Sequence, residues 1–335
     1  MGNVDEHSAS LAADPLPDSW QLPPGRILIT GANGHLGQRL IRTLAARVPL
    51  RALVRSASAQ AQVQGLLERL PRGSEGSADV QIVTGAYDDP QVLTEAVRDC
   101  VSAVHLVGII KQGQNNTFEQ AHVDTTRALV QAAEQHQLTR LVYLSIVGSA
   151  PEHRNPCLAS KGDAEQLLLA GSVPTTIYQV PMVLGEGDYA SKALGARARS
   201  SRAVTLRANS LEQPIYAGDV VRAVIRGLLD TSTEAQHLTL PGPEQLTRRS
   251  LIARAGAVVH NVPNIISLPV GLGLLAAGVL EKLQANPPVT RAMLGVLDHD
   301  DSADGTAAQA YLGFPLTSLD DTLRLCLDGG KHRQV

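Results

Sequence analysis

The stretch that most constrains the fold is an apolar run that stops at three evenly spaced glycines. Residues 26–30 read Arg-Ile-Leu-Ile-Thr, Gly31, Gly34 and Gly37 follow, and residues 38–46 have helical apolar spacing. This order predicts a strand, a tight turn and a helix. Glycines allow a backbone to approach a pyrophosphate closely, and the helix N-terminus offers free N–H groups to it. The stretch therefore predicts a dinucleotide-binding unit, with an ordinary glycine turn as the alternative.

The end of the next apolar run indicates which dinucleotide would bind. Residues 50–54 predict a second strand, and Arg55 follows it about where such folds meet the adenosine ribose. No carboxylate stands there to accept a bond from a ribose 2′-hydroxyl, whereas a guanidinium pairs well with a 2′-phosphate. The sequence thus favours NADP(H) over NAD(H). The alternative is that Arg55 is only a solvated charge at a strand end.

The rest of the chain alternates strands with helices. Further strands are predicted at 80–83, 101–107, 140–145 and 175–180, and they are too apolar to face water on either side. Such strands, separated by helices, predict an α/β protein with a Rossmann-type, doubly wound parallel sheet. We expect residues 1–24 to be a flexible tail and residues 25–180 to form this dinucleotide-binding domain. Residues 181–330 are expected to form a smaller, mainly helical lobe packed on the carboxyl edge of the sheet.

Composition narrows the range of partners. The chain has 335 residues, a net charge of −3 and only 3% aromatic residues, which gives no reason to expect nucleic acid. Its three cysteines show no metal or disulfide spacing, so we expect no metal site and a cytoplasmic location. The N-terminus does not read as a signal peptide. Residues 268–280 are strongly apolar but too short to span a bilayer. They predict a buried core helix or, alternatively, an interfacial helix that makes peripheral membrane contact or faces a quinone.

Several motifs together resemble one superfamily. They are Thr30-Gly-Ala-Asn-Gly-His-Leu-Gly37, His105-Leu-Val-Gly108, Phe118 to Asp124, Tyr143-Leu-Ser145, Ser160-Lys161, Pro181 with Gly185, and Pro214 to Val220. From residue 26 to about residue 246 the chain resembles the extended and atypical branch of the short-chain dehydrogenases/reductases. Within that branch it is most similar to the NAD(P)H-binding accessory subunit of respiratory complex I and its bacterial relatives. That narrower similarity depends chiefly on His122 and the Leu-Val-Gly turn at 106–108.

The resemblance implies roles for individual residues. In the superfamily a Ser, a Tyr and a Lys couple proton transfer to hydride transfer, and Ser145 and Lys161 match the Ser and the Lys. Cys157 stands at the tyrosine position, where its short thiol is either an inert buried group or a reactive one. The dinucleotide contacts expected are Gly31, Asn33, Gly34, His35, Leu36, Gly37, Arg55, Val107, Lys161 and Pro181.

Other departures from the superfamily pattern bear on function. Val180 replaces an arginine that usually precedes the proline, and Ala86 replaces an acidic residue after Gly85. Dinucleotide binding tolerates these changes better than the chemistry does. Two classes of function therefore stay open. One is a nucleotide-binding sensor or assembly factor with a protein partner, and the other is an NADPH-dependent oxidoreductase acting on a small apolar carbonyl or alkene. The basic stretch at 197–207 is expected to be solvated surface.

Overall fold

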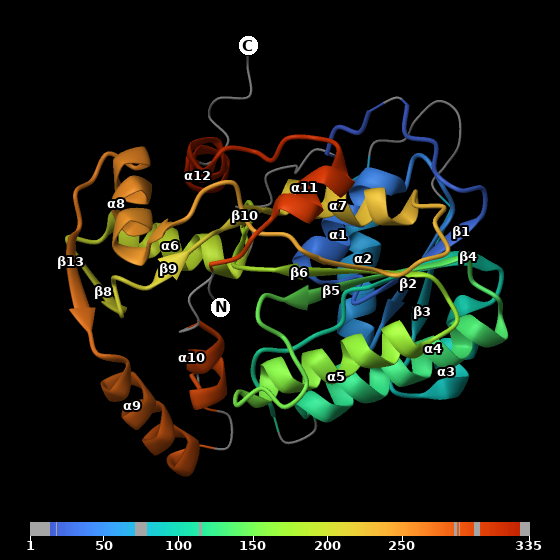
Figure 1. Cartoon of the computed structure of the whole chain (residues 1–335), viewed down its shortest axis with the longest axis horizontal. Coiled ribbons are helices and arrows are strands. Elements are labelled where there is room, and N and C mark those ends of the chain that lie inside the picture. Colours follow the sequence, from blue (N-terminus) through green and yellow to red (C-terminus); the bar gives the residue numbers. More distant parts are fainter. Residues whose placement is uncertain are drawn as a thin grey trace.

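A seven-stranded parallel sheet forms the centre of the computed structural model (Figure 1), which describes residues 14–17, 19–70, 79–113, 116–284, 287, 289–297 and 302–328. The strands lie in the order β11-β6-β5-β4-β1-β2-β3, and each neighbouring pair is parallel. Their bounds are β1 Arg26–Thr30, β2 Leu50–Val54, β3 Val80–Thr84, β4 Cys100–His105, β5 Arg140–Ile146, β6 Thr175–Val180 and β11 Gln236–Thr239. The predicted doubly wound sheet is confirmed.

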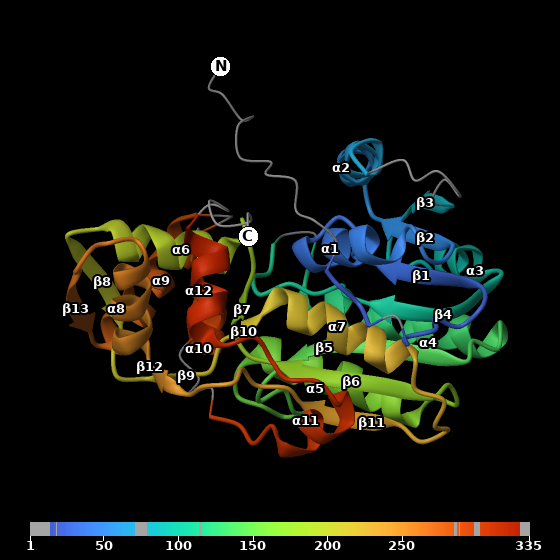
Figure 2. The ribbon, with the colours of Figure 1, turned by 90° about the horizontal axis from the view of Figure 1, so that it is seen from above.

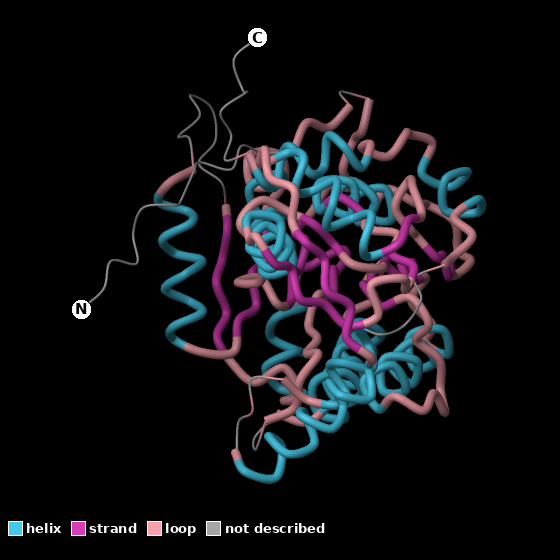
Figure 3. The backbone as a smooth tube through the Cα atoms, turned by 90° about the vertical axis from the view of Figure 1, so that its left-hand side faces the viewer, coloured by secondary structure: helices cyan, strands magenta, loops and turns pink. Residues whose placement is uncertain are grey.

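Helices cover both faces of this sheet (Figure 1), Figure 2 looks down on the face that carries α1 and α7, and the magenta strands of Figure 3 run between the two layers. One face packs against α1 His35–Leu44, α2 Ala57–Glu68, α7 Ala217–Leu228 and α11 Thr306–Leu312. The other face packs against α3 Pro90–Val97, α4 Thr125–Gln135 and α5 Pro156–Ala170. Two separate apolar clusters result, one on each side. This double coverage explains why β1, β2, β4, β5 and β6 are buried at nearly every position.

The order of the strands fixes where a ligand can bind. From β1 the chain builds β2 and β3 on one side and then crosses to β4 and β5 on the other. In open α/β sheets ligands bind beyond the carboxyl ends of the strands, at the point where the order reverses. Here that point lies between the ends of β1 and β4, next to Gly31.

Local signals set several helix boundaries. Asp89 caps α3 by accepting a bond from the Gln91 amide at 2.9 Å, and Pro90 occupies the first helical position. The helical stretch that follows β4 begins with a π-helical segment, Glu119–Asp124, and continues as α4. Apolar spacing could not reveal that widened turn, and such segments are frequent at functional sites.

The second half of the chain contributes to two regions. A C-terminal lobe is formed by α6 Tyr189–Arg199, β8 Arg202–Leu206, α8 Arg248–Val258, β13 Asn264–Leu268, α9 Val270–Leu283, α10 Arg291–Leu297 and α12 Leu319–Leu327. Short strands connect it: β7 Val183–Leu184, β9 Leu211–Glu212, β10 Ile215–Tyr216 and β12 Leu246–Thr247. By contrast, α7, β11 and α11 return to the central sheet. The region after residue 229 therefore contains more strands than the sequence predicted.

The apolar segment 268–280 is more exposed than its sequence predicts. It forms most of α9, but Ala277 is the only residue of that helix buried among those described. Leu275 is 67% exposed and Leu283 is 76% exposed, and α9 projects away from the sheet (Figure 1). The prediction of a buried core helix is therefore wrong, because in the described part of the chain only the side of this helix around Gly273 and Ala277 packs against neighbouring elements. In the described part of the chain, no helix combines the length and apolar character that crossing a membrane requires.

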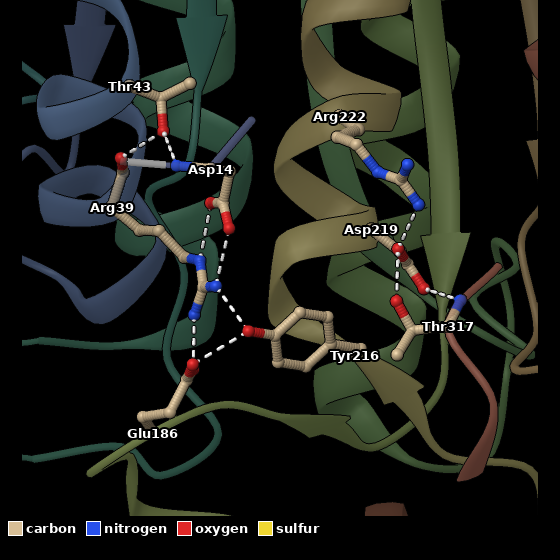
Figure 4. Close-up of polar contacts among 8 residues, drawn as sticks. All are labelled: Asp14, Arg39, Thr43, Glu186, Tyr216, Asp219, Arg222 and Thr317. Carbon is tan, nitrogen blue, oxygen red and sulfur yellow. Dashed lines mark hydrogen bonds and ion pairs between the residues drawn. The ribbon is translucent and has the colours of Figure 1, made fainter. Parts of the chain in front are cut away.

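A buried ionic network ties the lobe to the dinucleotide half (Figure 4). Arg39 of α1 donates to both carboxylate oxygens of Asp14 at 2.6 Å and to Glu186 at 2.5 Å. It also donates to the Tyr216 hydroxyl at 2.6 Å, and that hydroxyl in turn donates to Glu186 at 2.7 Å. Burial opposes the charge of Arg39, but its partners outweigh burial and raise its pKa. One side chain thereby joins the N-terminal segment, α1 and the loop that follows β7.

Helices α1 and α7 hold segments from near the two ends of the chain. Asp14 also donates its backbone N–H to Thr43 at 3.3 Å, so the expected N-terminal tail contacts α1 from residue 14 onward. Residues 1–13 of that tail lie outside the described residues. Near the other end, buried Asp219 accepts bonds from the amide and hydroxyl of Thr317 at 2.6 and 3.0 Å, and a bond from Arg222 at 2.5 Å (Figure 4). This clasp holds the segment that leads into α12.

Candidate functional site

The three glycines of the turn between β1 and α1 meet three different requirements. Gly31 has φ +67°, and a Cβ there would lie 3.1 Å from the carbonyl group of Leu106. A Cβ on Gly37 would lie 2.6 Å from the Gly31 carbonyl oxygen, which is closer than real contacts allow. At Gly34 only one atom, the Gly31 oxygen, comes within 4 Å. Gly31 therefore permits the turn, Gly37 permits α1 to pack closely, and Gly34 leaves the outer side open to an approaching group.

The N-terminus of α1 has no side-chain cap. Gly34 is the N-cap residue and provides no capping side chain, although helix starts in this protein such as those of α2 and α5 have one. Gly34 and His35 are exposed, and Leu36 is half-buried beside them. The unsatisfied N–H groups and the dipole of a helix start favour an anion. The turn thus fits the pyrophosphate of a dinucleotide.

Asn33 contributes to the shape of the turn. Its amide donates to Gln62 of α2 at 3.2 Å, and its carbonyl accepts a bond from Gln38 at 2.7 Å. These contacts hold Asn33 against α1 and α2, so its side chain supports the wall of the site.

Arg55 lies exposed directly after β2, where the sequence placed it. Tyr87, which the sequence analysis did not single out, stands nearby. Its hydroxyl donates to the Leu53 carbonyl at 3.4 Å and interacts with the backbone of Gly31 and Arg55. Burial raises the pKa of Tyr87, and the charge of Arg55 opposes this rise. Tyr87 therefore lies between the glycine turn and Arg55.

The end of β4 forms the opposite wall. His105 is buried and shares a hydrogen bond of 2.7 Å between its Nδ1 and the Thr30 hydroxyl, and one of 3.3 Å between its Nε2 and the Thr126 hydroxyl. Burial, with a smaller contribution from Lys161, lowers the pKa of His105 to about 3. A neutral imidazole therefore connects the ends of β1 and β4. Val107, also buried, follows it beside Gly31.

Lys161 on α5 is the charged group closest to this wall. Its ammonium donates to the Leu144 carbonyl at 2.9 Å and lies 4.4 Å from the centre of the Tyr143 ring. Burial lowers the pKa of Lys161 to about 8. A Cβ on Gly108 would lie 3.2 Å from the ammonium nitrogen, so a glycine there gives the lysine its space. Lys161 is thus fixed at the carboxyl end of β5, the strand that carries Ser145.

His122, in the π-helical segment, organises a chain of bonds. Its Nε2 accepts from the Ile109 amide at 3.0 Å, so its Nδ1 carries the proton and donates to the Ser160 hydroxyl at 2.8 Å. Ser160 donates onward to the Cys157 carbonyl at 3.0 Å. Burial lowers the pKa of His122 to about 3. This neutral histidine therefore holds the loop after β4 against the start of α5.

Cys157, at the expected tyrosine position, is completely buried. Its thiol donates to the Ile109 carbonyl at 3.4 Å, and burial raises its pKa to about 11. The thiol is therefore protonated near neutral pH and shielded from solvent.

Two further expected residues lie at the carboxyl ends of their strands. Ser145 is the residue before the last one of β5, and its hydroxyl is buried with no hydrogen-bond partner in the described part of the chain. Pro181 is buried directly after β6. An unsatisfied buried hydroxyl is costly, and a bound group that offers a polar atom would satisfy it.

A family model described as NAD(P)H-binding matches residues 31–204, more than half of the chain. The chain belongs to this NAD(P)H-binding family. The matched range begins at Gly31 and runs through the turn, Lys161 and Pro181. The chain therefore has the fold and the turn of a nicotinamide dinucleotide-binding protein.

Individual relatives share this family character. A ceramide reductase of Caulobacter vibrioides is 26% identical over 283 residues, which cover 81% of this chain and 82% of the relative. The 40 kDa mitochondrial subunit of NADH-ubiquinone oxidoreductase of Neurospora crassa is 23% identical over 195 residues, 57% of this chain and 51% of that subunit. These matches confirm the resemblance to reductases of this superfamily and to the complex I accessory subunit.

Solved structures show the same fold. A UDP-glucuronic acid 4-epimerase from Bacillus cereus, solved in complex with UDP-glucuronic acid and NAD, has a TM-score of 0.68 at 17% identity. The match covers 91% of this chain and 98% of the epimerase. The agreement therefore includes the C-terminal elements as well as the central sheet.

Sequence reasoning missed three residues that shape the site: Tyr87, His105 and Gly108. Tyr87 follows Gly85 and Ala86, the pair at which this sequence lacks the usual acidic residue. His105 and Gly108 were recognised only as parts of a motif. A polar residue at the end of an otherwise apolar strand, such as His105, was the available signal.

Proposed function

We propose that this protein binds NADP(H) in preference to NAD(H) and does not carry out the proton-coupled hydride transfer of its enzymatic relatives. It would act as a nucleotide-binding sensor or as an assembly or accessory factor. The observation that carries the proposal is the complete burial of Cys157, whose thiol is bonded to the Ile109 carbonyl where an enzyme would present a phenol. Its relative in complex I is named as a subunit of a larger assembly.

The dinucleotide would lie along the carboxyl edge of the sheet. Its pyrophosphate would meet Gly31, Gly34 and Gly37 and the uncapped start of α1, and its nicotinamide end would lie toward Lys161. Asn33, His35, Leu36, Val107 and Pro181 complete the proposed contacts. When bound, the nicotinamide supplies or accepts a hydride, and Lys161 and Ser145 are the polar groups available to hold its ribose or a second ligand.

Arg55 would determine the preference for a 2′-phosphate. Its guanidinium is exposed after β2, and Tyr87 lies close enough to feel its charge. A charge-assisted contact with a phosphate contributes about 1.5–3 kcal/mol. Arg55→Ala should therefore weaken NADPH binding about tenfold or more and change NADH binding little, as measured by calorimetric titration. Equal losses for both nucleotides would rule out this role.

A second candidate is an NADPH-dependent reductase acting on a small apolar carbonyl or alkene. The ceramide reductase match, which extends over four-fifths of this chain, favours it. So does Lys161, because burial lowers its pKa to about 8 and makes it a better proton donor than an ordinary lysine. An enzyme of this kind should oxidise NADPH with some carbonyl substrate, and Lys161→Ala should abolish that oxidation.

The substitution Cys157→Tyr separates the two candidates further. A phenol would have to replace a buried thiol that contacts the backbone at Ile109. Overpacking of this kind costs about 1–3 kcal/mol, and the phenol would have no fitted approach to a substrate. We expect no gain of reductase activity over a broad carbonyl panel. A large gain would show that the site is a silenced dehydrogenase, and the reductase candidate would then take precedence.

The accessory role has its own test. Purified protein should retain NADPH in fixed proportion, identified by mass spectrometry. An affinity-tagged form should recover the same partner proteins reproducibly in pull-down experiments. Recovery of no partner, together with NADPH oxidation that depends on Lys161, would refute the accessory role. We propose that residues 25–180 bind the nucleotide and that residues 181–330 contact a partner or substrate.

A further inference from the structure

The C-terminal lobe carries a large exposed apolar surface that the nucleotide site does not use. Its members are all more than one-third exposed, and they are Val204, Ile266, Leu268, Leu272, Leu275, Val279 and Leu283. We call them the lobe surface. Exposed apolar patches that gather on one part of a protein usually mark a docking site.

The strands β8 and β13 supply three of the seven residues of the lobe surface. They pair in parallel with Val204 opposite Ile266 and Leu206 opposite Leu268. Residues opposite each other in this register share one face of the sheet. The other face, which includes Ala203 and Ile265, packs into the core of the lobe. The outer face is therefore apolar without any layer of described residues covering it.

Helix α9 supplies the other four. Leu272, Leu275, Val279 and Leu283 recur at intervals of three and four residues, so they form one stripe along the helix. A Cβ on Gly273 would lie 2.7 Å from the Leu206 side chain, which means that α9 packs beside the outer face of β8. The strand face and the helix stripe thus adjoin. With 14 residues α9 is about 21 Å long, shorter than the hydrocarbon core of about 30 Å that a spanning helix must cross.

Charges around the lobe surface are mostly positive. Across α6, β8, α8, β13, α9 and α10 there are nine Lys or Arg residues and a single acidic residue, in a chain whose net charge is −3. Two of these cations are paired with carboxylates outside these elements, Arg248 with Glu212 and Arg254 with Glu244 and Asp320. The single acid, Glu281, pairs with Arg291 at 2.8 Å. Arg202 begins the strand face, and Lys282 lies next to Leu283 on α9. The acidic residues Asp320 and Asp321 belong to α12, which lies on the opposite side of α8 from β8 and β13 (Figures 1 and 2).

We propose that the lobe surface docks this protein on an anionic lipid bilayer, with α9 lying flat in the interface. Apolar side chains would enter the acyl boundary, and Arg202 and Lys282 would meet acidic head groups. A second copy of the chain fits less well, because a two-fold contact would oppose these cations to each other. The inference is independent of nucleotide binding.

Docking in this way would bring the proposed nucleotide site close to the bilayer. The segment between α9 and α10 accepts a bond at its Pro287 carbonyl from Lys111, 3.0 Å away, on the loop after β4. The Ala292 carbonyl of α10 accepts a bond at 2.9 Å from Asn155, the cap of α5. The chain that follows the bilayer-facing helix is therefore bonded to the two segments that carry Gly108 and Lys161.

Sedimentation with vesicles tests the proposal. The full-length protein should bind vesicles of mixed phosphatidylglycerol and phosphatidylcholine, and added salt should weaken that binding. Leu275→Asp combined with Val279→Asp should reduce binding roughly tenfold or more. Arg202→Glu combined with Lys282→Glu should reduce it to a similar extent. Tyr189→Asp is the matched control, because Tyr189 is 72% exposed in the same lobe but lies on α6, and it should bind normally.

NADPH titration and thermal melting of each variant show whether the fold is retained. Absence of vesicle binding by the wild-type protein would overturn the proposal. So would equal binding to phosphatidylcholine alone, or a dimer in analytical ultracentrifugation that Leu275→Asp with Val279→Asp dissociates. Failure to bind NADPH with intact vesicle binding would instead refute the proposed function and leave this inference standing.

Discussion

Replacing Arg39 by methionine should destabilise the whole molecule more than any surface substitution. The Arg39 side chain is 7% exposed, and its partners Asp14 and Glu186 are 8% and 16% exposed. Methionine preserves the aliphatic bulk but leaves two buried carboxylates without their cation. Removing one partner of a buried ion pair costs about 3–5 kcal/mol. Urea denaturation followed by circular dichroism should show a loss of this size in the free energy of unfolding.

The substitution Arg254→Met provides a matched control. Arg254 also pairs with two carboxylates, Glu244 and Asp320, but these are 46% and 54% exposed. Exposed pairs contribute about 0–1 kcal/mol, so Arg254→Met should be nearly neutral. Equal losses for the two variants would refute the claim that burial makes the Arg39 network important.

The same network should respond to acid. Burial works to raise the pKa of Glu186, but Arg39 and Tyr216 outweigh it and lower that pKa. A carboxyl whose folded pKa is lowered stabilises the protein above its unfolded pKa and loses this contribution as pH falls through the folded value. In the Arg39→Met variant this part of the acid sensitivity should disappear.

Three further outcomes are expected. Gly37→Ala should lower the free energy of unfolding by about 1–3 kcal/mol, since the new methyl would lie 2.6 Å from the Gly31 carbonyl oxygen. Gly65→Ala in α2 has open space around it and should raise the free energy of unfolding by about 0.5–1 kcal/mol. Urea midpoints that move in the same direction for the two variants would contradict this. Because burial lowers the pKa of Lys161 to about 8, from an ordinary value of 10.5, the folded state loses that proton first. The free energy of unfolding of the wild type, relative to Lys161→Met, should therefore rise by on the order of 1–3 kcal/mol between pH 8 and 10.5, and a flat difference would contradict the burial of this charge. His122, with its pKa lowered to about 3, should make the folded protein lose stability as pH falls below about 6.5, and His122→Gln should reduce that loss, as acid titration of ellipticity will test.

The central sheet could be predicted because its information is local. Apolar strands at regular spacing, the Gly31 to Gly37 turn and the Asp89-Pro90 helix start each depend on a few adjacent residues. Placing Arg55, Ser145 and Pro181 at one edge followed from the rule that parallel strands share their carboxyl ends.

The remaining features depend on contacts between distant residues. The network around Arg39 joins residues 25 and 147 positions away, and no sequence pattern indicates such pairings. The exposure of α9 could not be read from its apolar sequence, because a buried helix and an interfacial helix have similar composition. The π-helical turn at His122 is likewise set by tertiary packing on Ser160 and Ile109.

The most direct test of the account is a calorimetric titration of NADPH into the wild type and the Gly34→Ala variant. Gly34 has ordinary backbone angles and only one atom near its position for a Cβ, so the variant should fold normally. Its new methyl would occupy the open side where the pyrophosphate is proposed to approach α1. The account predicts that the wild type binds NADPH and that the variant, with an unchanged melting temperature, binds it about tenfold more weakly or worse. Equal affinity in the two proteins, or no binding by the wild type, would contradict it.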